Sequence, residues 1–422
     1  MPTNINRILR NYGELAVRVA LNLRAGQRLL IIGPLANGGC SLEAAPLVRT
    51  IAEQAYRAGA PFVEALWGDE ALQLARFTDA PRDTFDEVSA WFPRAITEHV
   101  NAGHAVISIT ANDPDLLKAQ PPELVGAVQT AVSKAVRPFR EHLSRNGTNW
   151  SVIAAPSQAW AARVFPNLPP EQQVAALWDA IAAVVRLDRE DPIAAWEEHL
   201  ANLAARRDFL NARRYVSLRY RGPGTDLSIG LPDGHSWVSG RSMSRQGIPF
   251  APNLPTEEVF TMPHRDRVDG TVSSTKPLSY AGTVIEGISM TFARGVVVRS
   301  SATRGEAVLR DLLATDAGAS RLGELALVPD DSPIAQSGLL FYNTLLDENA
   351  ASHLAIGNAY KFNVEGGEGL SEAEFEAVGG NRSVTHVDFM IGSATLDIDG
   401  VGRDGNAEPL MRNGTWALPI AP

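Results

Sequence analysis

The first half of the chain alternates strand patterns with helical patterns, and this alternation constrains the fold more than any other feature. Apolar runs that predict buried strands lie at 28–33, 62–67, 104–110 and 150–155. Between the first two runs, residues 42–58 carry apolar residues at helical spacing. Because successive strand, helix and strand units pair in parallel through a right-handed crossover, we predict an open α/β domain with parallel strands over residues 1–208.

The pattern changes near Tyr215. From there, alternating apolar and polar residues predict strands, including a hairpin in which 284–292 and 296–301 flank a short turn. Helical patterns are confined to two places, near 305–315 and 343–360. We therefore predict a mixed α/β protein whose second domain, residues 209–422, is strand-rich α+β and carries the functional site.

Composition and charge exclude several classes of protein. The 422 residues include 38 Lys and Arg against 48 Asp and Glu, a net charge of -10, so the chain lacks the basic excess typical of nucleic-acid-binding domains. The same charge disfavours anionic membranes, and no apolar run approaches the roughly 20 residues that span a bilayer. With one cysteine, Cys40, no intrachain disulfide can form, and the N-terminal residues do not resemble a signal peptide. We expect a soluble, cytoplasmic protein that binds neither nucleic acid nor membrane.

The glycine-rich segment 33–39 does not match a nucleotide-binding motif. It follows a predicted strand and precedes a helix, as a phosphate-binding loop does. However, it has neither a Gly-Lys-Ser/Thr ending nor the Gly-x-Gly-x-x-Gly spacing, so we interpret it as a connecting loop. The chain also has no Gly-x-Ser-x-Gly sequence, which argues against a hydrolase of the nucleophile-elbow type.

A histidine and an aspartate in the second half have a spacing that suits a metal. His386 and Asp388 lie two residues apart in an apolar run that predicts a strand, so both side chains project to the same face. An imidazole and a carboxylate side by side are common ligands of divalent transition metals. The same spacing suits an ordinary hydrogen-bonded pair, so this segment alone leaves both interpretations open.

Three glutamates near apolar strand patterns are further candidate ligands. Glu324 lies inside an apolar strand, where a carboxylate is costly to bury unless it is paired or holds a metal; a strand with a solvated face is the alternative. Glu257 and Glu258 precede an apolar pair of residues. Because neighbours on a strand point to opposite faces, we expect only one of these two to face a site.

The predicted helix near 343–360 contains the remaining candidates. His353 and Tyr360 are seven residues apart and would share a face if the helix continues that far. Glu348 is five residues before His353, so the two act together only if Glu348 lies at the helix start or in the preceding loop. A glutamate favoured there by the helix dipole is the alternative.

Four segments resemble the metal-site motifs of a known family, in the same order and with similar spacings. The run at 253–266 resembles the glutamate motif of the thermophilic-type metallo-aminopeptidases, the aminopeptidase T and aminopeptidase S family. The runs at 321–326, 347–357 and 386–391 resemble its other metal-site motifs. The resemblance extends weakly to 42–49, so it covers nearly the whole chain.

The resemblance implies an activity and a set of site residues. Members of this family hydrolyse the first peptide bond of peptides that have a free N-terminus, using two divalent metals. Carried onto the matching positions, the metal ligands would be Glu258, Glu324, Glu348, His353 and Asp388, with His386 as a further ligand or catalytic partner. Glu324 would bridge the two ions, and Tyr360 would line the site as an acid–base group or oxyanion donor. Glu257 would then lie behind the ligands or be exposed. The resemblance also implies a homodimer with an internal cavity that admits short peptides.

The residue types fit this chemistry. Carboxylates and imidazoles without a thiolate suit Zn, Co, Mn or Mg, and two such ions roughly 3.5–4 Å apart need a bridging carboxylate. The main alternative is a ring-cleaving dioxygenase in which His353, His386 and Asp388 hold a single Fe(II). One iron does not need three additional glutamates, so the acidic set favours the peptidase. A binding protein on an inactivated scaffold would lack ligands, and none is missing.

Overall fold

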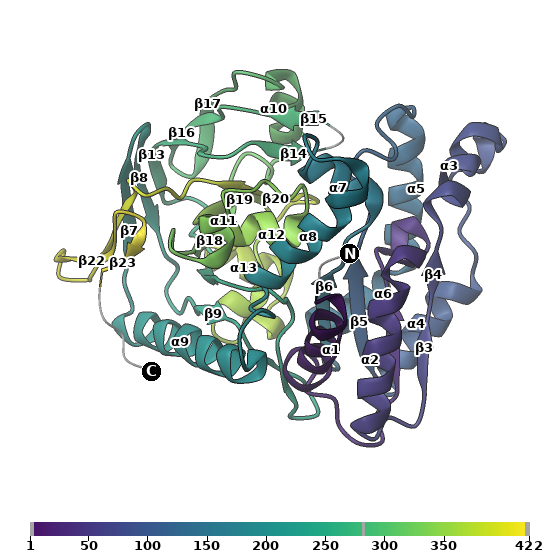
Figure 1. Ribbon diagram of the computed structural model, residues 1–422. Helices are drawn as coiled ribbons and strands as arrows, with labels where there is room; N and C mark the ends of the chain where they lie inside the picture. Colours follow the sequence, from purple (N-terminus) through teal and green to yellow (C-terminus); the bar gives the residue numbers. More distant parts are fainter. Residues whose placement is uncertain (1–3, 281–282, 418–422) are drawn as a thin grey trace. The chain divides into compact units, whose positions relative to one another are not determined.

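The computed structural model describes residues 4–280 and 283–417 (Figure 1). The chain forms two compact units. The N-terminal unit comprises residues 1–199, 241–255 and 340–345, and the C-terminal unit comprises residues 200–240, 256–339 and 346–422. The predicted fold class, a parallel α/β part followed by a strand-rich part, is confirmed. The predicted division at residue 208 stays a prediction.

A four-stranded parallel sheet forms the centre of the N-terminal unit. Its strands, in the order β3-β1-β5-β6, are β3 (Val63–Ala65), β1 (Leu29–Ile32), β5 (Ala105–Thr110) and β6 (Trp150–Ala154). All of β1 is buried, as expected for a parallel strand in a sheet covered on both faces. The four strands predicted in this half and their parallel pairing are therefore confirmed.

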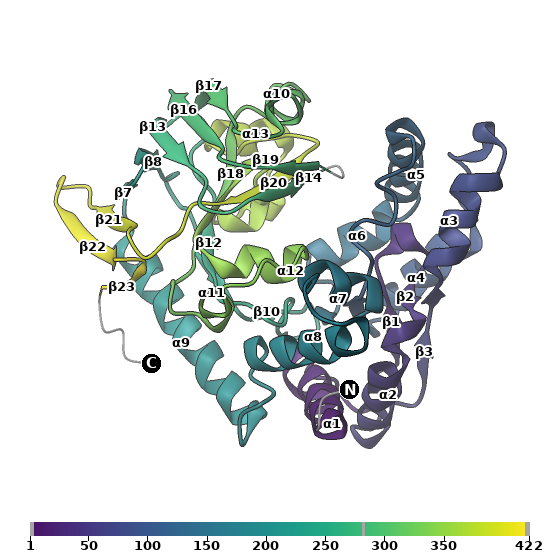
Figure 2. The same cartoon turned by 45° about the horizontal axis from the view of Figure 1, so that its top comes forward.

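Helices flank this sheet (Figure 2). They are α1 (Ile5–Leu15), α2 (Ala45–Arg57), α3 (Glu70–Asp79), α4 (Trp91–Asn101), α5 (Pro122–Ala135), α6 (Arg137–Ser144), α7 (Gln158–Val164) and α8 (Pro170–Val184). Two short strand pairs accompany them, β2 (Cys40–Ser41) with β4 (Trp67–Gly68) and β10 (Ser242–Met243) with β11 (Pro249–Phe250). Helix α2 stops where Gly59 adopts a φ of 91°, which a glycine tolerates without strain. Within residues 4–280 and 283–417, no helix combines the length and apolar character needed to cross a membrane.

Cys40 lies in β2 and its side chain is fully buried. Burial raises the pKa of the Cys40 thiol to about 12, so almost no thiolate forms at neutral pH. We expect the native protein not to react with a thiol reagent such as DTNB at pH 8, and to react with one equivalent in guanidinium chloride. Rapid labelling of the native protein would contradict this and would indicate local opening of β2.

Two antiparallel sheets form the C-terminal unit. The eight-stranded sheet consists, in order, of β17 (Val296–Ser301), β16 (Ser289–Ala293), β13 (Val268–Ser273), β8 (Thr225–Gly230), β7 (Ser217–Gly222), β21 (Asp397–Val401), β22 (Ala407–Arg412) and β23 (Thr415–Trp416). The five-stranded sheet consists of β20 (His386–Met390), β19 (His353–Gly357), β18 (Leu322–Leu327), β12 (Val259–Thr261) and β9 (Val238–Ser239). A separate hairpin joins β14 (Leu278–Tyr280) to β15 (Thr283–Ile285). The predicted hairpin around residues 293–295 is present as β16 and β17, with its first strand shorter than expected.

The remaining α-helices of the described residues follow α8 along the chain. They are α9 (Pro192–Arg213), α10 (Glu306–Leu313), α11 (Pro333–Ser337), α12 (Thr344–Asp347) and α13 (Glu372–Ala377). Helix α10 lies where the sequence predicts it.

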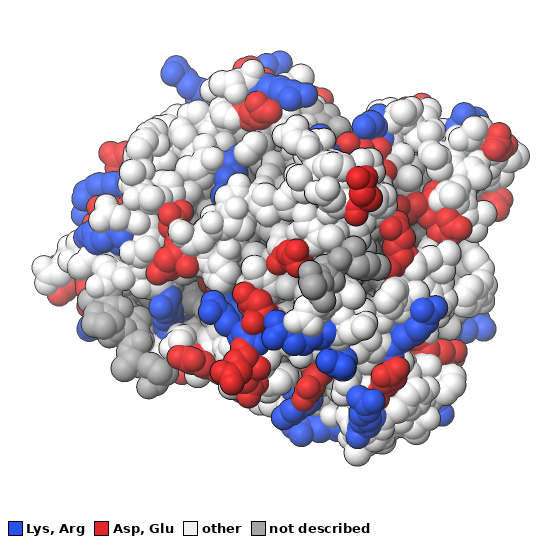
Figure 3. Space-filling view, viewed as in Figure 1, with Lys and Arg blue, Asp and Glu red and all other residues white. Residues whose placement is uncertain are grey.

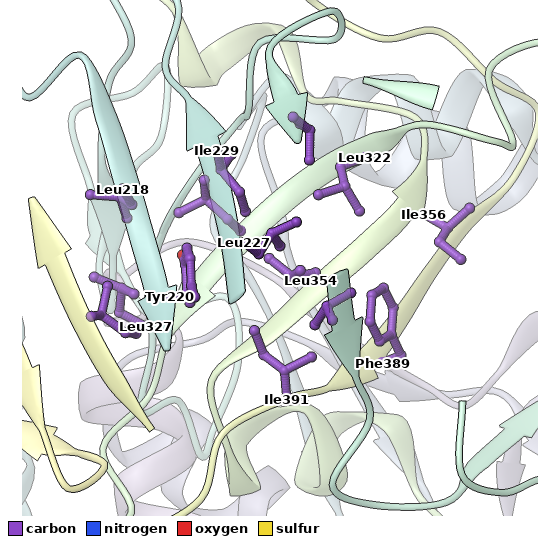
Figure 4. Packing of buried hydrophobic residues seen from close by; sticks show 14 of the residues in the cluster. Leu218, Tyr220, Leu227, Ile229, Leu322, Leu327, Leu354, Ile356, Phe389 and Ile391 are labelled. Carbon is purple, nitrogen blue, oxygen red and sulfur yellow. The ribbon is translucent and has the colours of Figure 1, made fainter. Parts of the chain in front are cut away.

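The apolar core of the C-terminal unit lies between its two sheets. Figure 4 shows side chains of β7 and β8, such as Leu218 and Ile229, packed against Leu327, Leu354 and Phe389 of the five-stranded sheet. These five side chains are almost completely buried. Because side chains alternate along a strand, the polar residues of β18, β19 and β20 must point away from this core.

The helix predicted near residues 343–360 is wrong. Helix α12 ends at Asp347, a single 3₁₀ turn covers Glu348–Ala350, and the chain then forms strand β19. Every residue of β19 is buried and only His353 is polar, so the sequence shows no clear alternation, and a short, mostly apolar run cannot be assigned by periodicity alone. The Ser352 hydroxyl donates to the backbone carbonyl of Val328 and accepts from the backbone N–H of Val328. These two hydrogen bonds hold the chain where it turns from the 3₁₀ segment into β19.

Charged side chains of both signs are interspersed on the face shown in Figure 3. Ion pairs among the described residues include Arg382 with Glu372 at 2.7 Å and Arg265 with Glu376 at 2.9 Å. The sequence as a whole has an acidic net charge of -10.

Candidate metal centre

The five-stranded sheet of the C-terminal unit presents polar residues on the face opposite to the core. In β18, Leu325 and Leu327 belong to the core, so Glu324 points to the other face. The same alternation in β19 and β20 gives this face three further polar side chains: His353, His386 and Asp388. The prediction that His386 and Asp388 share a strand face is therefore confirmed.

The strand register brings these residues together around small side chains. Ala355 of β19 pairs with Glu324 of β18 on one side and with Asp388 of β20 on the other. Gly357 of β19 pairs with His386 in the same way. At both positions β19 contributes a methyl group or a hydrogen, so the polar side chains of the flanking strands have room to meet above it.

Two further carboxylates come from segments outside the strands. Glu258 immediately precedes β12 and is 8 % exposed. Glu348 begins the 3₁₀ turn that follows α12. Both lie close enough to the polar face of the sheet for their charges to act on one another and on Glu324.

The imidazoles lie within a few ångströms of the carboxylates. Nε2 of His353 is 3.3 Å from Oε2 of Glu258 and 3.6 Å from Oε1 of Glu324. Nε2 of His386 is 3.9 Å from Oε2 of Glu324 and 3.7 Å from Oδ1 of Asp388. The potential ligand atoms therefore form two groups, each within 4.8 Å: Glu258, Glu324 and His353, and Glu324, His386 and Asp388. Glu324 belongs to both groups, and Glu348 lies outside them.

Backbone carbonyls orient both imidazoles. Nδ1 of His353 donates to the carbonyl of Ala351 at 3.1 Å, and Nδ1 of His386 donates to the carbonyl of Asn358 at 2.7 Å. A carbonyl only accepts, so Nδ1 carries a hydrogen in each ring and Nε2 faces the carboxylates. A bare Nε2 lone pair would repel those oxygens. Either a proton or a cation must lie between them.

The site concentrates negative charge in a buried environment. Burial, and then the charges of Asp388 and Glu258, raise the pKa of Glu324 to about 7, against a hydrogen bond from His353 that lowers it. Burial and the neighbouring carboxylates raise the pKa of Glu348 well above its usual value. Burial alone would lower the pKa of His353, but its contacts with Glu258 and Glu324 raise it well above the usual range. The ionised carboxylates therefore need additional positive charge.

These residues fit a divalent cation. Oδ1 of Asp388 is buried and has no hydrogen-bond partner among the described residues. Buried oxygens of this kind are normally paired or bound to a metal. Carboxylate oxygens and imidazole nitrogens are also the ligands that divalent metals of the first transition row, and Mg, accept.

Tyr360 lies beside the candidate metal centre, although not on a helix with His353. It follows the end of β19, and its ring centroid is 4.9 Å from that of His386. Phe362 stacks on Tyr360 at 5.1 Å with an interplanar angle of 7°, and Phe260 meets Phe362 edge-on at 6.2 Å. Burial and the nearby carboxylates raise the pKa of Tyr360, so its phenol keeps the proton.

The two adjacent glutamates, Glu257 and Glu258, differ in their relation to the two groups of potential ligands. Glu258 belongs to one of the two groups, whereas Glu257 belongs to neither. Glu257 is nevertheless only 3 % exposed, so the alternative that it is exposed is wrong. The residues that space and orient the side chains of the candidate site, including Ala355, Asn358 and Phe362, were missed because they carry no motif and depend on strand register or on loop conformation.

Comparisons with known proteins agree with this site. The family model described as thermophilic metalloprotease (M29) matches residues 5–416. Aminopeptidase 2 of Geobacillus stearothermophilus is 48% identical over 413 residues, covering 98% of each chain. Aminopeptidase T of Thermus thermophilus is 46% identical over 412 residues, covering 98% of this chain and 99% of the relative. The prediction of a metal-dependent aminopeptidase of the hydrolase class is thereby confirmed.

Solved structures give the same result. The structure of wild-type AmpT from Thermus thermophilus has a TM-score of 0.92 at 45% identity, covering 98% of this chain and 100% of the other. A 2,5-dihydroxypyridine dioxygenase from Pseudomonas putida has a TM-score of 0.52 at 14% identity, covering 99% of each chain, which is a likeness of fold alone. Because the family model spans nearly every residue, this chain belongs to the thermophilic metalloprotease (M29) family.

Proposed function

We propose that the chain removes the first amino acid from short peptides with a free N-terminus, using two divalent ions. The proposed ligands are Glu258, Glu324, Glu348, His353, His386 and Asp388. One observation carries the proposal: the two oxygens of Glu324 face different imidazoles, Oε1 towards His353 and Oε2 towards His386. A carboxylate shared in this way suits a bridge between two cations.

The balance of charge supports two ions rather than one. The four carboxylates of Glu258, Glu324, Glu348 and Asp388 bring four negative charges into a largely buried site. Two divalent cations would neutralise them, whereas a single cation would leave two uncompensated charges in a region of low dielectric constant. The ligands are oxygens and imidazole nitrogens, and the one cysteine of the chain lies in the N-terminal unit, so Zn, Co, Mn and Mg are the candidate metals.

The remaining side chains have roles that follow from their positions. Bound ions of this kind polarise a carbonyl and lower the pKa of a water molecule. Tyr360, protonated and beside His386, is positioned to donate its phenolic hydrogen to the oxyanion that develops on the scissile carbonyl. His386, held through Nδ1 by the Asn358 carbonyl, is either a further ligand or the group that transfers a proton to the leaving amine.

The single-iron dioxygenase is less consistent with the geometry. That alternative needs His353, His386 and Asp388 around one ion, but the two imidazoles fall into different groups. It also leaves the extra glutamates without a function. The dioxygenase of similar fold shares 14% identity, so its activity is not carried over to this chain.

The test compares a peptide with its blocked form. We expect the zinc- or cobalt-loaded protein to hydrolyse leucine p-nitroanilide and a leucine-initiated tripeptide, but not the N-acetylated tripeptide. Dialysis against a chelator should abolish hydrolysis, readdition of the metal should restore it, and elemental analysis should find two ions per chain. Equal cleavage of the acetylated peptide would contradict an aminopeptidase. One iron per chain, with oxygen uptake on a hydroxypyridine, would support the dioxygenase instead.

Three further properties stay predictions. The resemblance implies a homodimer, which light scattering coupled to size-exclusion chromatography would test. It implies an internal cavity, and a series of peptides of increasing length should then show a sharp fall in rate. The cytoplasmic location expected from the sequence is tested by fractionation of the producing cells.

A further inference from the structure

Two of the six proposed ligands are not held by a strand ladder. Glu324, His353, His386 and Asp388 lie in strands whose backbone hydrogen bonds fix their positions relative to one another. Glu258 and Glu348, the remaining two, lie just outside these strands, one before β12 and the other in a 3₁₀ turn. Their carboxylates can keep a defined place only if other contacts hold these two segments.

One buried side chain connects the two segments. Asn349 follows Glu348 directly, and its side chain is completely buried. Its Oδ1 accepts a hydrogen bond of 2.7 Å from the backbone N–H of Glu257, the residue directly before Glu258. The bond therefore spans 92 residues of sequence and ends next to a proposed ligand on each side.

The direction of this hydrogen bond determines which kind of side chain position 349 needs. The backbone N–H of Glu257 can only donate, so it needs an acceptor at this point. An apolar side chain at position 349 would leave that N–H buried without this bond, and the segment would rotate to find another partner. Because Glu258 is the next residue, its carboxylate would move with the segment.

We infer that Asn349 is a positioning residue that sets the separation between the carboxylates of Glu258 and Glu348. The inference rests on the proposed function in so far as both glutamates bind metal. Asn349 itself is not a proposed metal ligand. Groups that hydrogen-bond metal ligands directly typically change metal affinity by about 10- to 100-fold when removed, and we expect an effect of this size for Asn349.

The test measures metal affinity rather than activity alone. Asn349→Leu keeps the approximate volume of the side chain and removes the acceptor. Zinc affinity would be measured by competition with a chromophoric chelator, on protein whose folding is verified by circular dichroism. We expect affinity for at least one ion to fall about 10- to 100-fold. The visible spectrum of the cobalt-loaded variant should also change, because it reports the arrangement of ligands.

Asn149 provides a matched control. It is another completely buried asparagine, it lies in the N-terminal unit, and its Nδ2 donates to the carbonyl of Leu21 at 2.8 Å. Asn149→Leu should lower thermal stability without changing zinc affinity. If a leucine variant does not fold, the corresponding serine variant is measured, since its hydroxyl is too short to replace the amide oxygen.

The outcomes separate this inference from the proposed function. Unchanged zinc affinity and an unchanged cobalt spectrum in folded Asn349→Leu would overturn the positioning role. So would an equal loss of affinity in Asn149→Leu, which would point to a general effect of stability. The number of zinc ions bound by the wild-type chain tests the two-ion proposal independently, because the comparison between variant and wild type holds for one ion or for two.

Discussion

Glu324→Gln is expected to lower kcat/KM for leucine p-nitroanilide by about 10²- to 10³-fold, the scale of losing a principal electrostatic contact in an active site. Glutamine keeps the size of the side chain but has one carbonyl oxygen and no charge. Glutamine therefore cannot present a charged oxygen to each of the two groups, whereas Glu324 places one oxygen near His353 and the other near His386. Steady-state kinetics at saturating zinc or cobalt, with metal content measured in parallel, would provide the test.

Glu257→Gln is the matched control for this prediction. Glu257 is also a buried glutamate, adjacent to Glu258, but it belongs to neither group of potential ligands. We expect its replacement to reduce the rate far less than Glu324→Gln does. If Glu324→Gln kept the full rate, the bridging role would be wrong. If both variants were equally inactive, the division between Glu257 and Glu324 would be wrong.

The metal-free protein is expected to lose stability as the pH rises from about 5 to 8. Glu324 has a pKa of about 7 in the folded chain against a usual 4.5, mainly because it is buried. A carboxyl group with a raised folded pKa binds its proton more tightly in the folded state, so ionising it disfavours folding. The loss begins near the usual value of 4.5 and is largely complete above about 7.

His353 changes stability in the same direction. Its pKa is raised above the usual 6.5 by its contacts with Glu258 and Glu324, which outweigh the effect of burial. The stabilisation from the protonated imidazole is present below pH 6.5 and is lost as the pH rises through the raised value. The histidine therefore adds to the decline caused by Glu324 and does not offset it.

Urea unfolding of chelator-treated protein across this pH range would measure the effect. Bound zinc would compensate the carboxylate charges that protons compensate at low pH. It should therefore restore stability at pH 8 by about 4 kcal/mol at a concentration 1,000 times its dissociation constant. Metal-free Glu324→Gln should show a flatter pH dependence than the wild type. A metal-free stability that rises between pH 5 and 8 would contradict the presence of these carboxylates in one buried cluster.

Local patterns were sufficient for the first half of the chain. Leu29–Ile32 and the other parallel strands were predicted correctly because each is a short apolar run followed by a helical pattern and a turn. The strand 353–357 was mistaken for helix because all its residues are buried and only the first of them, His353, is polar, which is too little to reveal the alternation of a strand. Its conformation is decided by pairing with β18 and β20, which lie far from it in the sequence.

The sequence by itself determined which side chains could bind metal, because carboxylates in apolar surroundings, together with histidines at strand spacing, are costly unless they bind something. It also determined the family, through four motifs in order. Only the tertiary structure decided that Glu324 faces both imidazoles, that Ala355 leaves room between two carboxylates, and that Asn349 connects the segments of two proposed ligands. The physical reason is that strand register and long-range hydrogen bonds depend on residues tens of positions apart, and no local pattern encodes their distance.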